Sequence, residues 1–189
     1  MSEDVKRMGR ELAYQGTVLK VYKDHMKFSN GNTEDWDFIH HDGAAAVIPV
    51  MDDGKILMVK QYRNALERDT LEIPAGKLDD PDEEGIVCAS RELKEETGYS
   101  SDDLEWLLTI RTTVAFCDER IEVFVARNLI PGEQHLDEDE FVDVKAYKLE
   151  ELKEMIFEGR FRIPRRWQQS LRMSRNICMD RMHRTDKLR

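Results

Sequence analysis

The sequence predicts an α+β fold, in which a mixed β-sheet carries helices on both faces and a small antiparallel sheet precedes it. Apolar stretches of strand length alternate with stretches of helical periodicity, in the order β, β, α, β, β, α. The 189 residues are enough for one large domain with a small appendage. We therefore expect an N-terminal β region (1–42), a main domain (43–159) and a basic C-terminal helix (160–189).

The N-terminal region is predicted to consist of strands and tight turns, starting near residue 10. Residues 17–22 (TVLKVY) are rich in β-branched side chains and partly alternate. The Asn-Gly chemistry of residues 29–33 favours a hairpin turn, and residues 36–40 resume an extended pattern. These features indicate a small antiparallel sheet ahead of the main domain.

The main domain is predicted to open with strands at Gly43. The expected strands are 44–50, 56–61, 71–74, 104–111, 121–126 and 141–149, with a loop at 75–76. A helix is expected over 83–97, because apolar positions recur there at spacings of three and four until Gly98 stops the pattern. Its predicted apolar side contains Ile86, Ala89, Leu93 and Thr97. Further helices are expected at Leu149–Phe157 and 164–184.

The formal net charge of −10 is unevenly distributed. Residues 160–189 hold ten of the 29 Lys and Arg residues but only two of the 39 acids, which gives this tail a charge of +8 and leaves −18 on the rest. So acidic a body repels nucleic acid, and we expect no nucleic-acid partner.

The chain shows no sign of export or membrane insertion. No stretch approaches the roughly 18 apolar residues that a membrane span needs, and the first residues lack the apolar core of a secretory signal. The three cysteines are odd in number and widely spaced, which is typical of buried thiols rather than disulfides. We expect a cytoplasmic protein without membrane contact.

An acidic cluster marks the first predicted helix. Glu92, Glu95 and Glu96 are spaced i, i+3 and i+4, which places them on one side of a helix. Carboxylate oxygens are hard ligands that suit Mg²⁺ or Mn²⁺, and Arg91 is placed to pair with Glu83 or Glu95. On helix chemistry alone, a charged face exposed to solvent remains the alternative interpretation.

The same segment resembles the Nudix box, Gly-x5-Glu-x7-Arg-Glu-apolar-x-Glu-Glu-x-Gly-apolar. The residues that match in register are Glu83, Arg91, Glu92, Leu93, Glu95, Glu96, Gly98 and Tyr99. Gly76 also matches, with one extra residue before Glu83. The resemblance implies a Nudix-type α/β/α sandwich and a pyrophosphohydrolase in which Arg91 and Glu95 belong to the catalytic centre.

Beyond the box, residues 43–159 resemble the branch of the Nudix family that cleaves ADP-ribose and other nucleoside diphosphate sugars. The segments that carry this resemblance are GAAAVIPV, VKQYR, LEIPAGKL, CDERIEVFVARNL and LDEDEFVDV. The resemblance implies metal ligands at the Ala75 carbonyl, Glu92 and Glu96, with Glu95 assisting. It also implies that residues 1–42 contact the substrate and build a homodimer with a shared active site.

The acidic loop between the predicted strands 121–126 and 141–149 offers a catalytic base. The alternation Glu138-x-Glu140 resembles the branch's catalytic loop, which implies that Glu138 is the general base and Glu140 a further metal ligand. The register among the four acids of 137–140 stays open, with Glu133 as a substitute and a plain acidic turn as the alternative.

Four residues are predicted to contact the substrate. Arg63 resembles the branch's phosphate-contacting arginine, and Glu119 a residue near the substrate; a surface arginine and a salt bridge are the alternatives. Trp36 or Phe38 is placed to stack on a base, with core packing as the alternative. The chain departs from the branch at 114–116, which read Val-Ala-Phe instead of Pro-Gly-Phe, and at 36–43, which weakens the assignment to ADP-ribose.

The sequence thus predicts Mg²⁺-dependent hydrolysis, with Mn²⁺ possible, of the pyrophosphate bond of a nucleoside diphosphate derivative. ADP-ribose or another nucleoside diphosphate sugar is the expected substrate, and a nucleoside monophosphate and a sugar phosphate are the products. The alternative is a Nudix-fold module that senses nucleotides or binds RNA through the basic C-terminal tail.

Overall fold

Strands dominate the part of the chain that the computed structural model describes, which is residues 4–136, 138 and 140–159. The strands are β1 (Val5–Gln15), β2 (Lys20–Phe28), β3 (Thr33–His40), β4 (Ala44–Pro49), β5 (Ile56–Arg63), β6 (Arg68–Glu72), β7 (Ala75–Lys77), β8 (Tyr99–Ser100), β9 (Asp103–Arg111), β10 (Arg120–Arg127), β11 (Ile130–Pro131) and β12 (Val142–Tyr147). The helices are α1 (Gly85–Thr97), α2 (Leu149–Phe157) and the 3₁₀ turn η1 (Asn64–Leu66).

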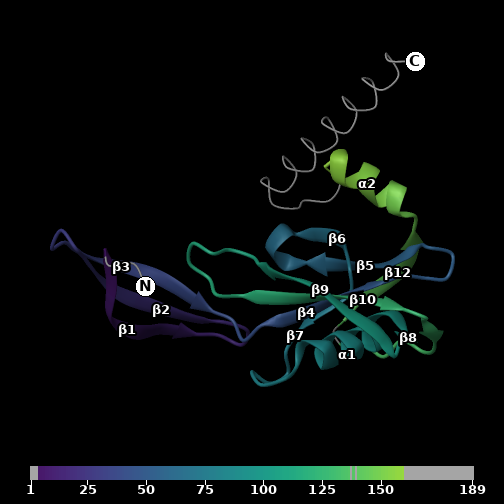
Figure 1. Ribbon diagram of the computed structural model, residues 1–189, viewed down its shortest axis with the longest axis horizontal. Helices are drawn as coiled ribbons and strands as arrows, with labels where there is room; N and C mark the ends of the chain where they lie inside the picture. Colours follow the sequence, from purple (N-terminus) through teal and green to yellow (C-terminus); the bar gives the residue numbers. More distant parts are fainter. Residues whose placement is uncertain (1–3, 137, 139, 160–189) are drawn as a thin grey trace, which may run out of the picture.

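The main body is layered, with a helix outside each of two sheets (Figure 1). One sheet has the order β7-β4-β10-β9, in which β4 and β10 run parallel and the other pairs antiparallel. The second sheet, β12-β5-β6, is antiparallel, and α2 lies on its far side. The predicted α+β class, with a mixed sheet between helices, is therefore confirmed.

The core forms where α1 packs on the mixed sheet. Cys88, Ala89 and Leu93 of α1 are fully buried against the small and branched residues of β4 and β10. Small residues such as Ala45 let the helix approach the sheet closely, which explains the alanine-rich sequence of β4. This packing also brings Glu92 and Glu96 of α1 against β7.

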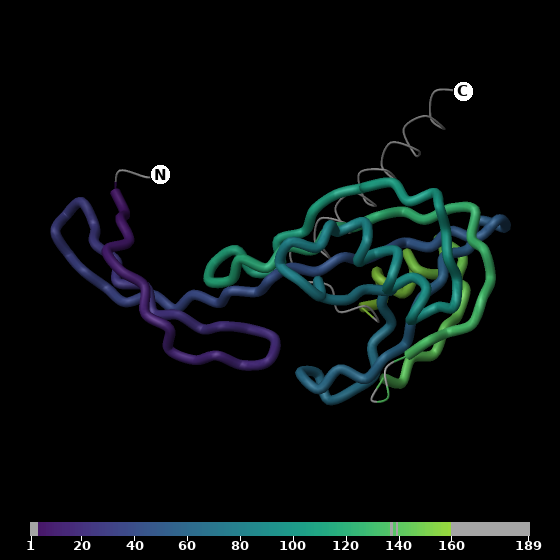
Figure 2. Tube along the Cα trace, turned by 90° about the horizontal axis from the view of Figure 1, so that it is seen from below, coloured from purple at the N-terminus to yellow at the C-terminus, as the bar shows by residue number. Residues whose placement is uncertain are grey.

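The first three strands form a separate antiparallel sheet, β1-β2-β3, that projects from the main body (Figure 2). Its polar centre is an ion pair in which Arg10 Nε and Nη2 both donate to Asp24 at 2.6 Å. Asp24 is 7% exposed, and the hydrogen bond from Arg10 outweighs burial and holds the pKa of Asp24 below its usual value. The predicted small antiparallel sheet is thus present.

The loop between β9 and β10 ties this sheet to the main body. The Ile39 N–H donates to the Phe116 carbonyl at 2.7 Å, and the Asp118 N–H donates back to the Ile39 carbonyl at 3.2 Å. His40 Nδ1 lies 2.7 Å from Asp118 Oδ2, and the His41 N–H donates to Asp118 Oδ1 at 3.0 Å. Asp118 therefore anchors the end of β3 with both carboxylate oxygens.

Several element boundaries differ from the sequence predictions. Residues 75–76, expected as a loop, belong to β7, because their backbone pairs with β4. Thr17 and Val18, expected in a strand, lie in the turn between β1 and β2, while β1 itself was not predicted. Ile86, expected on the buried side of α1, is 41% exposed, because the buried stripe runs through Cys88 instead.

The expected basic helix within 160–189 lies outside the described residues. Among the residues that are described, neither helix is long and apolar enough to cross a membrane.

We expect Leu93→Ala to lower the free energy of unfolding by about 2–5 kcal/mol, because it empties a fully buried position between α1 and the mixed sheet. The matched control is Leu66→Ala in η1, where the side chain is 47% exposed and the loss should stay well below that range. Urea denaturation of both variants measures the difference; equal losses would contradict the packing described here.

Candidate active site

The most deeply buried acid of the box is Glu96. Its residue is 3% exposed, and its Oε2 accepts a hydrogen bond of 3.1 Å from the backbone N–H of Ala75 in β7. Burial raises the pKa of Glu96 to about 8, and the negative charge of Glu92 adds to the rise. A carboxylate placed in this way is costly to ionise unless a cation lies beside it.

Glu92 lies directly against the backbone of Gly76. A Cβ atom at position 76 would fall on the Glu92 carboxylate, so only glycine leaves room for this side chain. Burial raises the pKa of Glu92, and the charge of Arg91 opposes the rise. The pairing of β7 with β4 holds Gly76 in place and so fixes the position of Glu92.

Arg91 forms ion pairs with the surrounding acids. Its Nη1 donates to Glu92 Oε1 at 2.6 Å and to Glu95 Oε2 at 3.2 Å. Asp79 Oδ2 lies 3.3 Å from its Nε, and Glu83 Oε2 lies 3.6 Å from its Nη2. The predicted pairing of Arg91 with Glu83 or Glu95 is confirmed for both partners, and the guanidinium orients the carboxylates on either side of it.

The turn before α1 absorbs the extra residue between Gly76 and Glu83. The Asp79 N–H donates to Glu83 Oε2 at 2.8 Å, and the Glu83 N–H donates to the Asp80 carbonyl at 2.9 Å. The insertion therefore leaves the contact between Glu83 and Arg91 intact.

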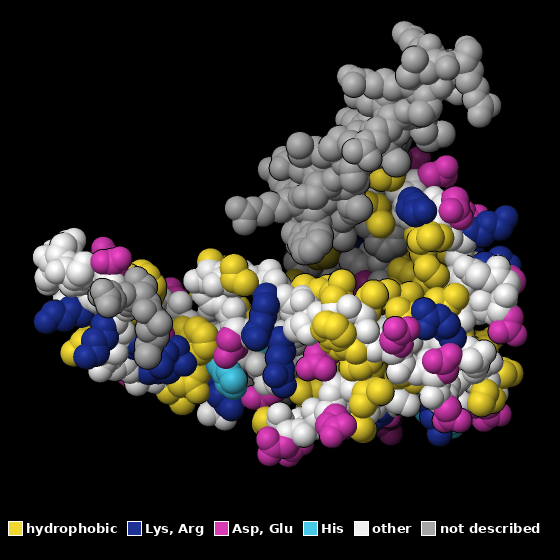
Figure 3. All heavy atoms as spheres, in the orientation of Figure 1, with side chains coloured by type: hydrophobic (Ala, Val, Ile, Leu, Met, Phe, Trp, Pro, Cys, Tyr) yellow, Lys and Arg dark blue, Asp and Glu magenta, His cyan; other side chains and the backbone are white. Residues whose placement is uncertain are grey.

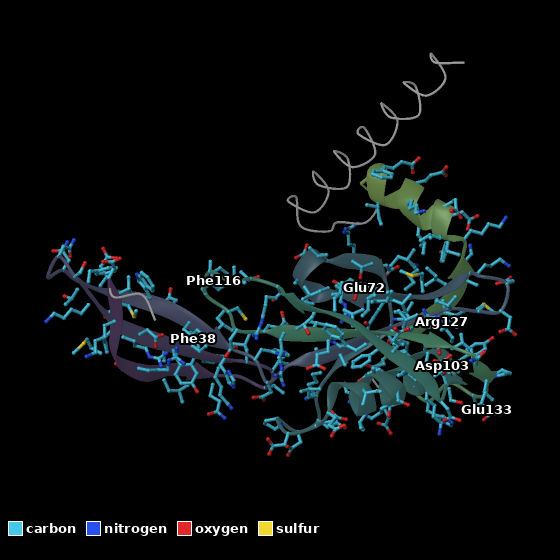
Figure 4. All side chains as sticks on the ribbon, in the orientation of Figure 1. Phe38, Glu72, Asp103, Phe116, Arg127 and Glu133 are labelled. Carbon is cyan, nitrogen blue, oxygen red and sulfur yellow. The ribbon has the colours of Figure 1, made fainter. Side chains whose placement is uncertain are left out.

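Arg63 is positioned by the second sheet. Its Nε and Nη2 donate to the two carboxylate oxygens of Glu72 at 3.0 and 2.7 Å. Burial opposes ionisation of Glu72, but the hydrogen bonds from Arg63 and Thr70 outweigh it and hold the pKa of Glu72 below its usual value. Glu72 ends β6 in the second sheet, and Figure 4 marks its place in the main body.

Glu140 belongs to the same acidic centre. It lies two residues before β12, which pairs with β5, the strand that carries Arg63. Burial is the main cause of the raised pKa of Glu92 and Glu96, and the charge of Glu140 adds to the rise in both. Glu138 is exposed in the turn just before it, and residues 137 and 139 lie outside the described part of the chain. Among the described residues, no three His, Cys, Asp or Glu side chains gather closely enough to enclose a metal ion by themselves.

The two predicted stacking residues differ in their surroundings. Trp36 is 44% exposed and meets Phe28 edge to face, with 5.8 Å between ring centroids. The guanidinium of Arg10 covers Phe38 at 3.7 Å from its ring centroid, and Tyr22 packs beside it. Trp36 therefore presents an accessible ring, whereas Phe38 takes part in the packing of the N-terminal sheet.

A groove of about 700 Å³ lies between β3 and the loop that connects β9 to β10. It is lined by Val21, Asp35, Trp36, Asp37, Ile39, Ala115 and Phe116. Phe116 stands at the tip of this loop next to the sheet that carries Phe38 (Figure 4). Glu119 follows in the same loop, where it accepts a hydrogen bond of 2.5 Å from Thr112 and lies 3.9 Å from His41 Nε2.

Cys88 is not a candidate nucleophile. It is fully buried, and its Sγ faces the carbonyls of Gly76 and Lys77. Burial raises the pKa of the Cys88 thiol to about 11, so the reactive thiolate is absent at neutral pH. Cys88 therefore does not act as a covalent nucleophile, and the acids of the site remain the candidate catalytic groups.

Glu72 and Gln134 were not predicted from the sequence. A signal for Glu72 was present, because Thr70 and Glu72 alternate on a strand that pairs with Arg63's strand. Gln134 gave no local signal, because the Glu96 carbonyl, to which its side chain donates at 2.5 Å, lies 38 residues earlier in the chain.

Comparison with known proteins identifies the family to which this chain belongs. The chain belongs to the Nudix family, whose domain profile matches residues 40–167. The predicted resemblance and the predicted enzyme class, a Nudix pyrophosphohydrolase, are confirmed. Enzymes of this family use divalent metal ions and act on nucleotide derivatives.

Two Bacillus proteins are similar over most of their length. The chain is 43% identical over 157 residues to a "Methanol dehydrogenase activator" of Bacillus methanolicus and 40% identical over 157 residues to an "ADP-ribose pyrophosphatase" of Bacillus subtilis; each alignment covers 82% of this chain and 84% of the relative. An "ADP-ribose pyrophosphatase" of Mycobacterium tuberculosis is 32% identical over 126 residues, which is 67% of this chain and 61% of the relative.

The fold has a clear structural counterpart. A crystal structure titled "ADP compounds hydrolase" superposes with a TM-score of 0.77 at 22% identity, covering 95% of this chain and 96% of the other. At that identity, the likeness supports the fold alone.

We expect Gly76→Ala to weaken Mn²⁺ binding by at least about ten-fold, because the new Cβ displaces the Glu92 carboxylate. The matched control is Gly9→Ala in β1, where the nearest atom to a new Cβ is His25 Cδ2 at an ordinary 3.6 Å. Isothermal titration with Mn²⁺ measures both variants. Unchanged binding in Gly76→Ala would show that Glu92 does not hold metal from this position.

Proposed function

We propose that this chain hydrolyses the pyrophosphate bond of ADP-ribose or another nucleoside diphosphate sugar and releases a nucleoside monophosphate and a sugar phosphate. The observation that carries the proposal is a pair of carboxylates held against β7 in the register of the Nudix box: Glu96, which is buried, and Glu92, which is partly buried. The names of two relatives, at 40% and 32% identity, support ADP-ribose as the first substrate to test.

The acids at this site fit a hard divalent cation, for which we propose Mg²⁺ with Mn²⁺ as the substitute. Glu92, Glu96, Glu140 and the Ala75 carbonyl would hold it, with Glu95 assisting. The raised pKa of Glu96 supports this set, because a nearby cation would favour the ionised carboxylate. When bound, such a cation neutralises charge on the diphosphate and polarises the bond that breaks.

The remaining roles follow from the positions of the side chains. We propose Glu138 as the general base, since its exposed carboxylate is open to water; such a base typically contributes about 10²–10⁴-fold to the rate. Arg91 orients Glu92 and Glu95 from the side. Arg63 would contact a phosphate, and Glu72 holds its guanidinium in a fixed plane for that purpose.

Substrate choice is proposed to lie at the groove beside β3. Trp36 would stack on the base, Phe38 would support the sheet behind it, and Glu119 would contact the substrate from the adjoining loop. Ala115 and Phe116 of the Val-Ala-Phe sequence form the other wall, so the identity of the base and sugar would depend on this loop.

We also propose that the chain acts as a cytoplasmic homodimer. Exposed hydrophobic residues occur on the N-terminal sheet and on β9, which is an edge strand of the mixed sheet. On β9 they are Trp106, Leu107, Leu108 and Ile110, and on β1 and the turn after it they are Met8, Leu12, Tyr14 and Val18. Hydrophobic side chains are visible on the surface of both parts in Figure 3. An apolar edge of this kind is typically covered by a partner.

We expect Glu96→Gln to lower Mg²⁺-dependent hydrolysis of ADP-ribose by at least about 100-fold, because the amide cannot serve as an anionic ligand. The substituted side chain still offers Ala75 an oxygen acceptor, so the fold should persist. Glu84→Gln, at the exposed N-cap of α1, is the matched control. The assay should also include GDP-mannose, UDP-glucose and NADH. No Mg²⁺-dependent turnover of any substrate by wild type would refute the proposed hydrolase, and equal turnover by Glu96→Gln and wild type would refute the proposed role of Glu96.

The same measurement separates the enzyme from its rival, a nucleotide sensor that binds RNA through the basic tail. A sensor would bind ADP-ribose without Mg²⁺-dependent turnover. The complete set of box acids favours the enzyme, because a sensor has no need of every ligand.

We expect Leu108→Glu to convert the homodimer into a monomer, because it buries a charge in the proposed interface on β9. Light scattering coupled to gel filtration measures the mass, and Leu66→Glu in η1 is the matched control. A wild-type monomer, or a Leu108→Glu variant that remains dimeric, would rule out this interface.

A further inference from the structure

The two ends of the acidic loop meet at the side chain of Gln134. Its Nε2 donates to the Glu96 carbonyl at 2.5 Å and to the Val142 carbonyl at 3.2 Å. Glu96 lies at the end of α1, and Val142 is the first residue of β12. One amide group therefore links the helix of the box to the strand that follows the loop.

The orientation of this amide follows from its partners. Both partner atoms are carbonyl oxygens, which only accept hydrogen bonds, so the amide nitrogen rather than its oxygen must face them. The two hydrogens of Nε2 serve one carbonyl each. A side chain of the same length without two donors cannot make this link.

Independent backbone contacts hold the start of the loop on α1. Gly98, with φ of +75°, approaches the 132–134 backbone so closely that a Cβ would lie 2.9 Å from the Gln134 nitrogen. A Cβ at Gly132 would lie 2.9 Å from the Gly98 carbonyl oxygen. The His135 N–H donates to the Glu95 carbonyl at 3.0 Å. Gly98 therefore has two roles: it ends α1, and its lack of a side chain lets the 132–134 backbone pack against the end of the helix.

The far end of the loop is held by strand pairing. Val142 pairs with Gln61 of β5, and Glu140 precedes Val142 by two residues. Because Val142 lies opposite Gln61, this register brings the chain at Glu140 to the end of β5 that carries Arg63. Because both ends of the loop are held, the distance from Glu140 to α1 depends on the link that Gln134 makes between the Glu96 and Val142 carbonyls.

We propose that Gln134 is a positioning residue, which joins the end of α1 to the start of β12 and so holds Glu140 at the carboxylates of Glu92 and Glu96. The inference rests on the proposed function for the role of Glu140 as a metal ligand. Gln134 touches neither substrate nor metal; it acts through the carbonyls of Glu96 and Val142.

The test compares Gln134→Met, which removes both donors, with Gln134→Lys, whose ammonium can still donate to two carbonyls. Gln15→Met, at the exposed end of β1, is the matched control. For Gln134→Met we expect kcat to fall by about ten-fold and the half-saturating Mg²⁺ concentration to rise, with KM for ADP-ribose little changed. Gln134→Lys should recover most of the loss, and Gln15→Met should match wild type.

Two readouts do not depend on turnover. Mn²⁺ titration without substrate should show weaker binding in Gln134→Met, and hydrogen exchange should show loss of protection at the His135 amide. Wild-type kcat and Mg²⁺ dependence in Gln134→Met, or a fall in kcat with no change in Mg²⁺ or Mn²⁺ dependence, would overturn the inference. If wild type hydrolyses no nucleotide while Gln134→Met still weakens Mn²⁺ binding, the proposed function fails and the positioning role stands.

Discussion

The site depends on holding two carboxylates close together and away from water. Glu92 and Glu96 repel each other, and burial raises the pKa of both. Three features keep them in place: the Ala75 N–H, the guanidinium of Arg91 and the space that Gly76 leaves open. Each lies on β7 or on α1 itself, so the packing of this helix on the mixed sheet determines the geometry of the acids. Positive charge supplied at this point would relieve the strain that the fold imposes on them.

The helix could be predicted from the sequence because its signals are local. Periodicity, the stop at Gly98 and the spacing of Arg91 from its acids all act within a few turns. The strand β7 was missed because it exists only through pairing with β4, distant in the chain. Gln134 was missed for the same reason, since the carbonyls that it joins meet only in the folded protein. The order β, β, α, β, β, α gave the correct class of the main domain. In the N-terminal region, strands were expected from about residue 10, and the start of β1 at Val5 was missed because its residues mix charge with a few exposed apolar side chains.

The residues proposed for catalysis and those proposed for substrate choice lie in different parts of the molecule. The acids lie on α1 and the loop before β12, within the packed main body, whereas the groove beside β3 lies between the projecting sheet and the loop at 112–119. Asp118 joins these parts through contacts to His40 and His41. Because the groove is built from exposed residues outside the core, its sequence can change with little cost to the packing that holds the acids. This division allows residues 36–43 and 114–116 to vary while the Nudix box stays intact.

The central claim is that the acids of α1 and Glu140 form one metal site. Anomalous diffraction from crystals grown with Mn²⁺ tests it most directly, since each bound ion gives a peak that identifies its ligands. The account predicts a peak within coordination distance of Glu92 and Glu96, with Glu140 or the Ala75 carbonyl also in contact. Active crystals with Mn²⁺ bound elsewhere and none at these carboxylates would contradict it.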